Sequence, residues 1–259
     1  MKGEFKNILV IQTAFIGDAI LASSVLEKLH AFLPQSQISI LVRKGNESLY
    51  VNHPFLKEVL IWNKQEGKYA SLFKLRKQIK DNHFDAVINL HRYASSGFLT
   101  AFSGAKFKAG FDKNPFSFLF TKKAQHVIGD GRHETERYNA LIEDFTDKKV
   151  ERPRLYPSND DFNKVDQFKK GKYVCMSPSS VWFTKQLPEE KWVELINQLP
   201  NDVTVYLLGG KGDVEMCNRL KDSDARKKSI VLAGDLSLLQ SAALMKDSQM
   251  NYVNDSAPL

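Results

Sequence analysis

The sequence predicts an α/β fold built on parallel sheets, because apolar runs of strand length alternate with segments of helical periodicity. The first run, residues 7–11, reads Asn-Ile-Leu-Val-Ile, and such a continuous apolar run is typical of a strand covered on both faces. Apolar residues at helical spacing follow it: Ala19, Leu21, Ala22, Val25, Leu26 and Leu29. Strands that alternate with helices indicate βαβ units and a doubly wound sheet.

The alternation occurs twice, which predicts two domains. The first half is expected to hold further strands at 38–42, 59–62 and 85–89 and a helix at 70–79. The second half is expected to hold strands at 173–177, 203–208, 230–232 and 250–253, and helices at 188–199, 213–220 and 236–245. Residues 147–161 carry two prolines, many charges and little apolar periodicity, so we expect a linker there. The predicted domains are 1–150 and 151–259.

The composition is that of a soluble globular protein. The 259 residues are 42% hydrophobic and 26% charged, which excludes disordered and fibrous classes. Cys175 and Cys217 are too few for a disulfide framework, so a reducing cytosol is expected, and no stretch approaches the roughly 18 apolar residues of a membrane span. The second domain stops after the strand at 250–253. We therefore expect that domain to be truncated, with apolar surface exposed around 203–208 and 250–253.

Positive charge is concentrated in the first half of the chain. The chain has 37 Lys and Arg residues and 30 Asp and Glu residues. Residues 1–150 hold 22 of the basic and 15 of the acidic residues, whereas residues 151–259 hold 15 of each. Residues 98–123 alternate seven phenylalanines with five lysines. This segment either contacts an anionic lipid surface, or its phenylalanines fill the core while its lysines keep the domain soluble, as the frequent burial of Phe favours.

The turn between the first strand and first helix is one candidate site. In an open α/β sheet, ligands bind beyond the carboxyl ends of the strands, and Gly17 and Asp18 lie there. An ionised Asp18 at a helix N-terminus is suited to act as a general base. The alternative is that Asp18 only caps the helix.

Three strand ends of the second half carry further candidates. Ser179, Ser180 and Lys185 form a plausible phosphate cradle, or else a solvated loop. Gly209 and Asp213 suit a tight turn and a ribose contact, or a plain helix cap. The turn that contains Asp255, Ser256 and Ala257 suits an anion bound by backbone N–H groups, or is an ordinary Asx turn.

Residues 133–137 begin a helix and do not form an HExxH zinc motif. Arg92, Arg132 and His133 are able to reach an acceptor phosphate in the first crevice, although an exposed, ion-paired face is the more common use of such residues. No GxGxxG fingerprint or Walker loop occurs in the chain.

In order and spacing, these motifs resemble glycosyltransferase family 9, the ADP-heptose:lipopolysaccharide heptosyltransferases. The resemblance spans essentially the whole chain. It rests on Ile16-Gly17-Asp18, Ser179-Ser180 with Lys185, Pro188 and Trp192, Gly209 with Asp213, Gly234-Asp235-Leu236-Ser237-Leu238, and Asn254-Asp255-Ser256. Ala257 departs from the family's usual glycine, and the chain ends before the histidine that would follow.

The resemblance implies a GT-B architecture of two Rossmann-like domains, the first binding the acceptor and the second a nucleotide-sugar donor. It implies an inverting reaction without metal or other cofactor, in which Asp18 is the base. The donor residues would be Gly17, Ser179, Ser180, Lys185, Gly209, Asp213, Leu236, Asp255, Ser256 and Ala257, with Asp213 on the ribose and Leu236 against the adenine. The acceptor would be an anionic lipopolysaccharide precursor, reached by a cytoplasmic enzyme peripheral to the inner membrane through its basic first half.

Two other classes stay open. A sugar-nucleotide epimerase shares the two-domain fold but needs further carboxylates in the second crevice. A basic nucleic-acid-binding protein needs positive charge along one groove with exposed aromatic residues, whereas the strand-end motifs suit a small nucleotide. We therefore expect a glycosyltransferase that binds no nucleic acid.

Overall fold

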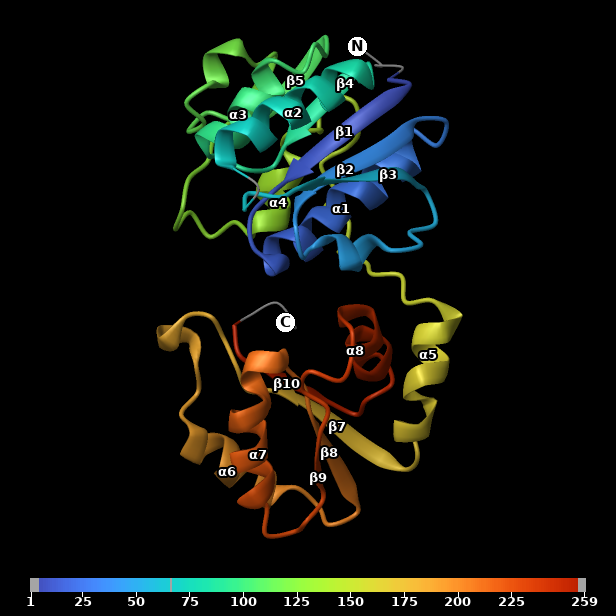
Figure 1. The fold of residues 1–259 in the computed structure, drawn as a ribbon, viewed down its shortest axis with the longest axis vertical. Helices are drawn as coiled ribbons and strands as arrows, with labels where there is room; N and C mark the ends of the chain where they lie inside the picture. Colours follow the sequence, from blue (N-terminus) through green and yellow to red (C-terminus); the bar gives the residue numbers. More distant parts are fainter. Residues whose placement is uncertain (1–4, 66, 256–259) are drawn as a thin grey trace. The chain divides into compact units, whose positions relative to one another are not determined.

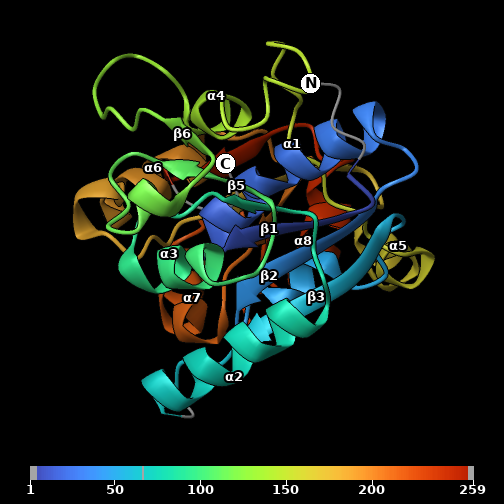
Figure 2. The same ribbon diagram turned by 90° about the horizontal axis from the view of Figure 1, so that it is seen from above.

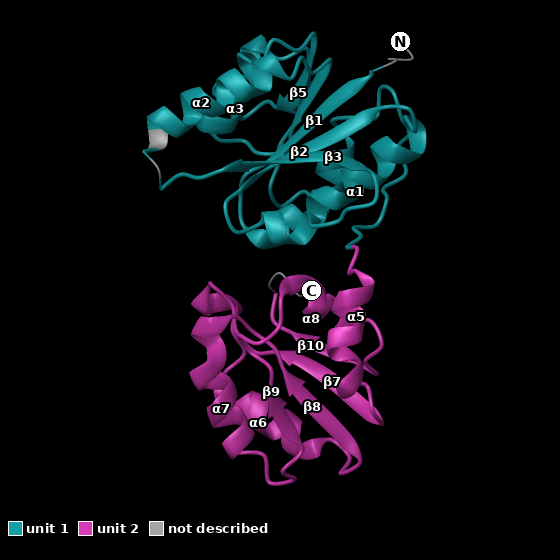
Figure 3. Ribbon diagram, turned by 45° about the vertical axis from the view of Figure 1, so that its right-hand side comes forward, with its two compact units in different colours: residues 1–155 teal, residues 156–259 magenta. Residues whose placement is uncertain are grey.

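The computed structural model describes residues 5–65 and 67–255 and divides the chain into two compact units (Figures 1 and 3). Unit 1 is Met1–Leu155 and unit 2 is Tyr156–Leu259, so the division falls five residues after the expected boundary. The expected linker 147–161 is wrong at its end, where helix α5 (Asn159–Val165) begins. Ser158 caps this helix by accepting the Asp161 N–H, while the Asp161 carboxylate accepts the Ser158 N–H. This reciprocal cap is a sequence signal for a helix start.

Unit 1 holds one sheet in which every strand pair is parallel. Its strands, in the order β3-β2-β1-β4-β5-β6, have the bounds β1 Asn7–Gln12, β2 Gln37–Arg43, β3 Leu56–Trp62, β4 Ala86–Asn89, β5 Phe107–Phe111 and β6 Lys122–Ala124. Its helices are α1 Ile16–Phe32, α2 Lys68–Asp81, α3 Ala94–Ala101 and α4 Glu134–Asn139, with 3-10 turns η1 Glu47–Tyr50 and η2 Ser117–Leu119. Helix α3 and strands β5 and β6 were not among the elements expected from the sequence.

Both faces of the first sheet are covered by helices (Figures 1 and 2). On β1, Ile8 and Val10 belong to the core that α1 covers. The alternate residues Leu9 and Ile11 belong to the core beneath α2 and α3. Because successive side chains point to opposite faces, a strand buried on both sides needs the continuous apolar run that β1 shows.

Unit 2 repeats the arrangement on a smaller sheet of order β10-β7-β8-β9. The strands are β7 Lys172–Ser177, β8 Val203–Leu207, β9 Ser229–Val231 and β10 Asn251–Val253. Besides α5, the helices are α6 Glu189–Gln198, α7 Val214–Asp222 and α8 Leu238–Met245, with 3-10 turns η3 Asp166–Phe168, η4 Phe183–Lys185 and η5 Lys211–Asp213. Helices α6 and α7 cover one face, and α5 and α8 cover the other (Figure 3).

The expectation that apolar residues of 203–208 are exposed is wrong, because α7 and α8 cover that strand on its two sides. Val205 and Leu207 are fully buried in one core, and Tyr206 and Leu208 are buried in the other. In the other segment expected to be exposed, 250–253, the Met250 side chain is about half exposed.

Each sheet has a topological switch point, where strand order reverses and a crevice opens at the carboxyl ends. In unit 1 the reversal falls between β1 and β4, and in unit 2 between β7 and β10. The turn containing Asp18 follows β1, whereas Ser179 and Asn254 follow β7 and β10. The fold thus places the motifs that contain Asp18, Ser179 and Asn254 at the two switch points.

Candidate active site

A cavity of about 570 Å³ opens at the switch point of unit 1. Residues at or just beyond the ends of β1, β2, β3 and β4 line it, together with residues of α4, and they include Phe15, Asp18, Arg43, Lys64, Arg92 and Tyr138. A cavity of this volume is in the range of small-molecule sites, and it lies at the strand ends where the sequence predicted the acceptor crevice.

The Asp18 carboxylate is held from two sides. It occupies the third position of α1, and its Oδ2 accepts the Phe15 N–H at 3.2 Å. The Tyr138 hydroxyl lies 3.5 Å from its Oδ1 and in turn accepts a hydrogen bond of 2.8 Å from Gln12 Nε2. Asp18 therefore caps the helix with one oxygen while its side chain lines the cavity, so capping and a role in the cavity do not exclude each other.

The pKa of Asp18 is raised above the ordinary carboxyl value. Burial is the main cause, because it removes water from the charged form, and the nearby Glu134 carboxylate adds to the rise. The Phe15 N–H and the Tyr138 hydroxyl act in the opposite direction by donating to the carboxylate. A raised pKa makes the carboxylate a stronger base, which suits it to take a proton from a substrate hydroxyl.

Three cations line the same cavity, each lying against an aromatic ring. The distances from cation to ring centroid are 5.3 Å for Arg43 on Phe15, 4.5 Å for Lys64 on Trp62 and 5.6 Å for Arg92 on Tyr93. Within the described residues, neither Arg43 nor Arg92 forms an ion pair with a carboxylate. Because unpaired guanidinium groups bind phosphate and carboxylate ligands well, the cavity is suited to an anionic substrate.

Arg137 and His91 add no free positive charge to the cavity. The guanidinium of Arg137 donates to Glu134 and Asp130, at 2.9 Å each. His91 has a pKa of about 4, lowered chiefly by burial and further by Lys64 and Arg92, so its ring is neutral at neutral pH. Its Nδ1 lies 3.0 Å from Thr13 Oγ1, which joins the turns after β4 and β1 across the switch point.

Of the three predicted acceptor residues, only Arg92 lines the cavity. Arg132 pairs with Asp130 at 2.7 Å. The His133 ring accepts the Thr135 N–H and caps α4. Sequence reasoning missed Arg43 and Lys64, although both stand at or just after strand ends, and it missed Tyr138, which comes from a distant helix and has no local signal.

In unit 2, Asn254 joins the turn after β10 to the loop after β7. Its Nδ2 donates to the Pro178 carbonyl at 2.7 Å, and its Oδ1 accepts the Leu187 N–H at 3.0 Å. Asn254 is buried, so one side chain fixes both ends of the loop that carries Ser179, Ser180 and Lys185. Lys185 Nζ also lies 2.6 Å from Asp255 Oδ2. The loop and the last motif therefore meet in the structure, as a shared anion site requires.

The remaining donor candidates lie at the ends of β8 and β9. Asp213 Oδ2 accepts the Gly210 N–H at 2.7 Å, and a Cβ at Gly209 would lie 2.8 Å from the Asp213 Cβ, so this turn needs glycine. The Gly234 N–H donates to the Gly209 carbonyl at 2.9 Å, which joins the turn after β8 to the turn after β9.

The other predicted donor residues lie elsewhere. Leu236 is half-buried against the core beneath α8. Gly17 lies in the first turn of α1, while Ser256 and Ala257 lie outside the described residues.

No group of three or more His, Cys, Asp or Glu side chains in residues 5–65 and 67–255 is placed to hold a metal ion. In the same ranges, no helix combines the length and the apolar character needed to cross a membrane.

The two units define an α/β protein of two parallel sheets, with candidate sites at its strand ends, and comparison with known proteins gives its family. The model of glycosyltransferase family 9 (heptosyltransferase) matches residues 72–259. The chain belongs to this family, as its motifs indicated.

Individual relatives agree with this assignment. The chain is 24% identical to the lipopolysaccharide core heptosyltransferase OpsX of Haemophilus influenzae, over 98% of its own length and 74% of that protein. It is 23% identical to lipopolysaccharide heptosyltransferase 1 of Pseudomonas aeruginosa, over 74% of its own length and 58% of that protein. The crystal structure of a family 9 glycosyltransferase from Veillonella parvula is similar in fold, with a TM-score of 0.88 at 21% identity, covering 100% of this chain and 77% of that one. The expected fold of two parallel α/β units, of the GT-B class, is thereby confirmed.

Proposed function

We propose that this chain carries the machinery of an inverting, metal-independent transfer of a heptose or related sugar from an ADP-sugar to a lipopolysaccharide core acceptor. One observation carries the proposal: a half-buried carboxylate of raised pKa, Asp18, lines a cation-rich cavity at the switch point of unit 1. The names of the two relatives, both lipopolysaccharide heptosyltransferases, support the class of sugar and acceptor.

In the proposed reaction, Asp18 accepts the proton of an acceptor hydroxyl. The hydroxyl oxygen forms a bond to the anomeric carbon as the bond from that carbon to the diphosphate oxygen breaks. This single displacement inverts the anomeric configuration, and the proton on Asp18 is later lost to water. Arg43 and Arg92 hold the anionic groups of the acceptor, so that the attacking hydroxyl lies near the base.

Unit 2 supplies the proposed donor site. Lys185 and the backbone of the turn after Asn254 stabilise the negative charge that develops on the leaving diphosphate. The turns that follow the four strands of unit 2 lie along one edge of the sheet, in the strand order β10, β7, β8, β9. At about 4.8 Å between strands this edge extends about 14 Å, enough for a diphosphate near β7 and β10 with its ribose near Asp213.

The test is product analysis with a panel of nucleotide sugars. The purified chain is incubated with ADP-heptose, other ADP-sugars or UDP-sugars and a deacylated lipopolysaccharide core acceptor, and products are identified by mass spectrometry. We expect a heptosyl adduct and ADP. Asp18→Asn should lower turnover about 100-fold or more with ADP affinity unchanged, whereas Asp81→Asn, an exposed carboxylate on α2, should not. Near-normal turnover of Asp18→Asn would exclude Asp18 as the base.

A further inference from the structure

Three consecutive apolar side chains are exposed in the loop that follows β7. Val181 is 81% exposed, Trp182 is 59% exposed and Phe183 is 86% exposed. They stand between Ser180 and Lys185, in the loop that we assign to the donor diphosphate. Single exposed apolar residues are common on protein surfaces, whereas apolar residues that are exposed side by side mark a surface that binds a ligand or a partner.

Hydrogen bonds within the loop hold the backbone of Trp182 in a defined place. The Trp182 N–H donates to Ser180 Oγ at 3.4 Å, and the Trp182 carbonyl accepts the Lys185 N–H at 2.9 Å. Gln186 Nε2 donates to the Ser180 carbonyl at 2.5 Å, across the base of the same turn. Because Asn254 also fixes both ends of the loop, the indole is presented from a braced backbone.

The 3-10 turn η4 places Trp182 together with Lys185. Trp182 caps this turn, and Lys185 is its last residue. Residues three apart in a 3-10 helix lie one above the other, so Trp182 stands on the side of the turn that carries Lys185. Phe183 is turned away from that side by about 120°. Within the described residues, no aromatic ring or cation packs against the Trp182 indole, so a ring face is available to a ligand of Lys185.

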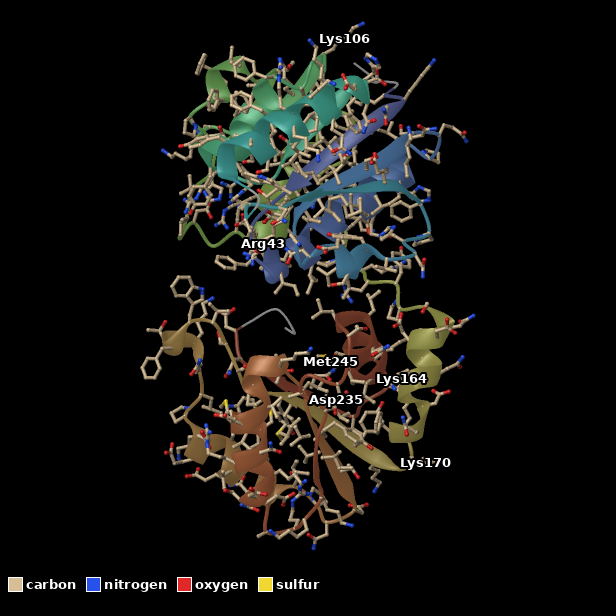
Figure 4. All side chains as sticks on the ribbon, viewed as in Figure 1. Arg43, Lys106, Lys164, Lys170, Asp235 and Met245 are labelled. Carbon is tan, nitrogen blue, oxygen red and sulfur yellow. The ribbon has the colours of Figure 1, made fainter. Side chains whose placement is uncertain are left out.

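The order of the strands directs the sugar of the donor, rather than its base, toward Trp182. The proposed diphosphate site lies near β7 and β10, with the ribose near Asp213 after β8. Asp235 belongs to the turn after β9, two strands from β7 (Figure 4), or about 10 Å at the usual spacing of strands. Leu236, expected against the adenine, is in that same turn. The sugar is attached at the other end of the diphosphate and therefore lies nearer the loop after β7.

We propose that Trp182 is a specificity-determining residue whose indole stacks on the ring face of the sugar that the donor carries. The C–H bonds of a sugar ring carry partial positive charge, and the face of an indole is negative, so the two surfaces attract. Stacking also removes apolar surface of both partners from water. The inference rests on the proposed function and deepens it, because it assigns a residue to the sugar of the donor. Trp182 takes no part in making or breaking bonds.

Paired calorimetric titrations with ADP and with ADP-heptose, without acceptor, test the proposal. Trp182→Ala should raise the Kd of ADP-heptose about 5-fold to 30-fold, because it removes two or three weak contacts to C–H groups. The Kd of ADP should stay the same. Trp182→Phe keeps a ring face and should restore most of the affinity for ADP-heptose. Phe183→Ala is the matched control, an exposed aromatic residue on another side of the same turn, and should change neither Kd.

The titrations separate failure of this inference from failure of the proposed function. A native chain that binds ADP, with an unchanged Kd of ADP-heptose in Trp182→Ala, would overturn the stacking and leave the donor site in place. Equal weakening of ADP and ADP-heptose would mean that the ring contacts the nucleotide, and equal loss in Phe183→Ala would mean a general effect on the loop. Either result would overturn the inference. A native chain that binds neither ligand would remove the proposed donor site and this inference together.

Quenching of tryptophan fluorescence tests the native chain without relying on a substituted loop. The chain has three tryptophans, and Trp62 and Trp192 are each 2% exposed. Acrylamide therefore quenches Trp182 most strongly, and Trp182→Phe supplies the baseline. ADP-heptose should remove most of this quenching, whereas ADP alone should leave it. Equal protection by the two ligands, or no protection by bound ADP-heptose, would overturn the proposal.

Discussion

Lys185 Nζ lies 2.6 Å from Asp255 Oδ2, which joins the loop after β7 to the turn after β10 across the switch point of unit 2. The side chains are 43% and 68% exposed, so the pair stabilises the fold by about 1 kcal/mol at most. Because this ion pair is weak, Lys185 can readily exchange Asp255 for another anion. In the proposed donor site, a diphosphate, which carries more negative charge than one carboxylate, would replace Asp255 on Lys185.

Removing Lys185 is expected to weaken ADP binding. Lys185→Ala deletes a hydrogen bond to a charged group, a loss of about 1.5 to 3 kcal/mol, which corresponds to a rise in Kd of about 10-fold to 150-fold. Calorimetric titration of ADP measures this. Lys191→Ala on α6 is the control, because that lysine pairs with Glu194 within its own helix. An unchanged Kd in Lys185→Ala would exclude Lys185 from the diphosphate site.

Asp255→Asn is expected to act in the opposite direction. The variant keeps the size of the side chain and removes the carboxylate that competes for Lys185. Because an exposed pair contributes about 1 kcal/mol or less, ADP should bind up to about fivefold more tightly, as measured by the same titration. A Kd that rises tenfold would mean that the Asp255 carboxylate itself contacts the donor.

Asn254 is expected to hold the loop 179–186 in place. Asn254→Ala leaves the Leu187 N–H and the Pro178 carbonyl without this partner, at a cost of about 1 to 3 kcal/mol in the free energy of unfolding. Limited proteolysis followed by mass spectrometry should show faster cleavage within this loop. Asn251→Ala, at the exposed start of β10, removes side-chain hydrogen bonds to Met245 and Ser248 and should leave loop cleavage unchanged. Equal cleavage rates in the two variants would contradict the clamp.

Two substitutions are expected to move the acidic limb of the pH profile in opposite directions. The Tyr138 hydroxyl lowers the pKa of Asp18 and the Glu134 carboxylate raises it. The base must be ionised to work, so activity is lost as pH falls through the pKa of Asp18. Tyr138→Phe should shift the acidic limb of kcat/KM to higher pH, and Glu134→Gln should shift it to lower pH. Shifts in the same direction in both variants would show that a group other than Asp18 controls the limb.

The sequence predicted the elements that its local pattern determines. Continuous apolar runs predicted β1, β2, β7 and β8 to within a residue or two. Strands with weaker patterns were missed, because β5 contains Lys108 and Gly110 and β6 reads Lys-Lys-Ala. Their strand form depends on pairing with neighbours in the sheet, which no local pattern records. Helix α3, with the sequence Ala-Ser-Ser-Gly-Phe-Leu-Thr-Ala, has weak helix formers, and packing against β4 and α2 supplies its stability.

In the candidate site too, some residues are predictable from their place in the sequence, and others are found only in the folded chain. Asp18, Lys185 and Asp255 were predictable because each follows a strand, and parallel strands bring their carboxyl ends to one edge. Arg43 and Lys64 follow the same rule, so strand ends alone would have found them. Tyr138 and the clamp by Asn254 depend on contacts between distant segments, and only the folded chain shows them.

Buried Lys28 is expected to stabilise unit 1 far more than an exposed lysine does. Its side chain is 0% exposed, and its Nζ donates to the Asp147 and Lys149 carbonyls at 2.5 Å each and lies 2.9 Å from Asp147 Oδ1. Lys28→Met should lower the free energy of unfolding by about 2 to 4 kcal/mol, a fall in Tm of about 5 to 15 °C. Lys149→Met, an exposed side chain next to the same carbonyls, should change stability by less than about 0.5 kcal/mol.

Acid titration tests the mechanism of this stabilisation. Hydrogen bonding to Lys28 lowers the pKa of Asp147 below its ordinary value. A carboxyl whose pKa is lower in the folded state stabilises the fold above its unfolded pKa, and this stability is lost as pH falls toward the folded pKa. Between neutral pH and about pH 3, the native protein should therefore lose stability more steeply than Lys28→Met, as measured by urea unfolding at each pH. Parallel curves would show that Lys28 acts by packing alone and not through its charge.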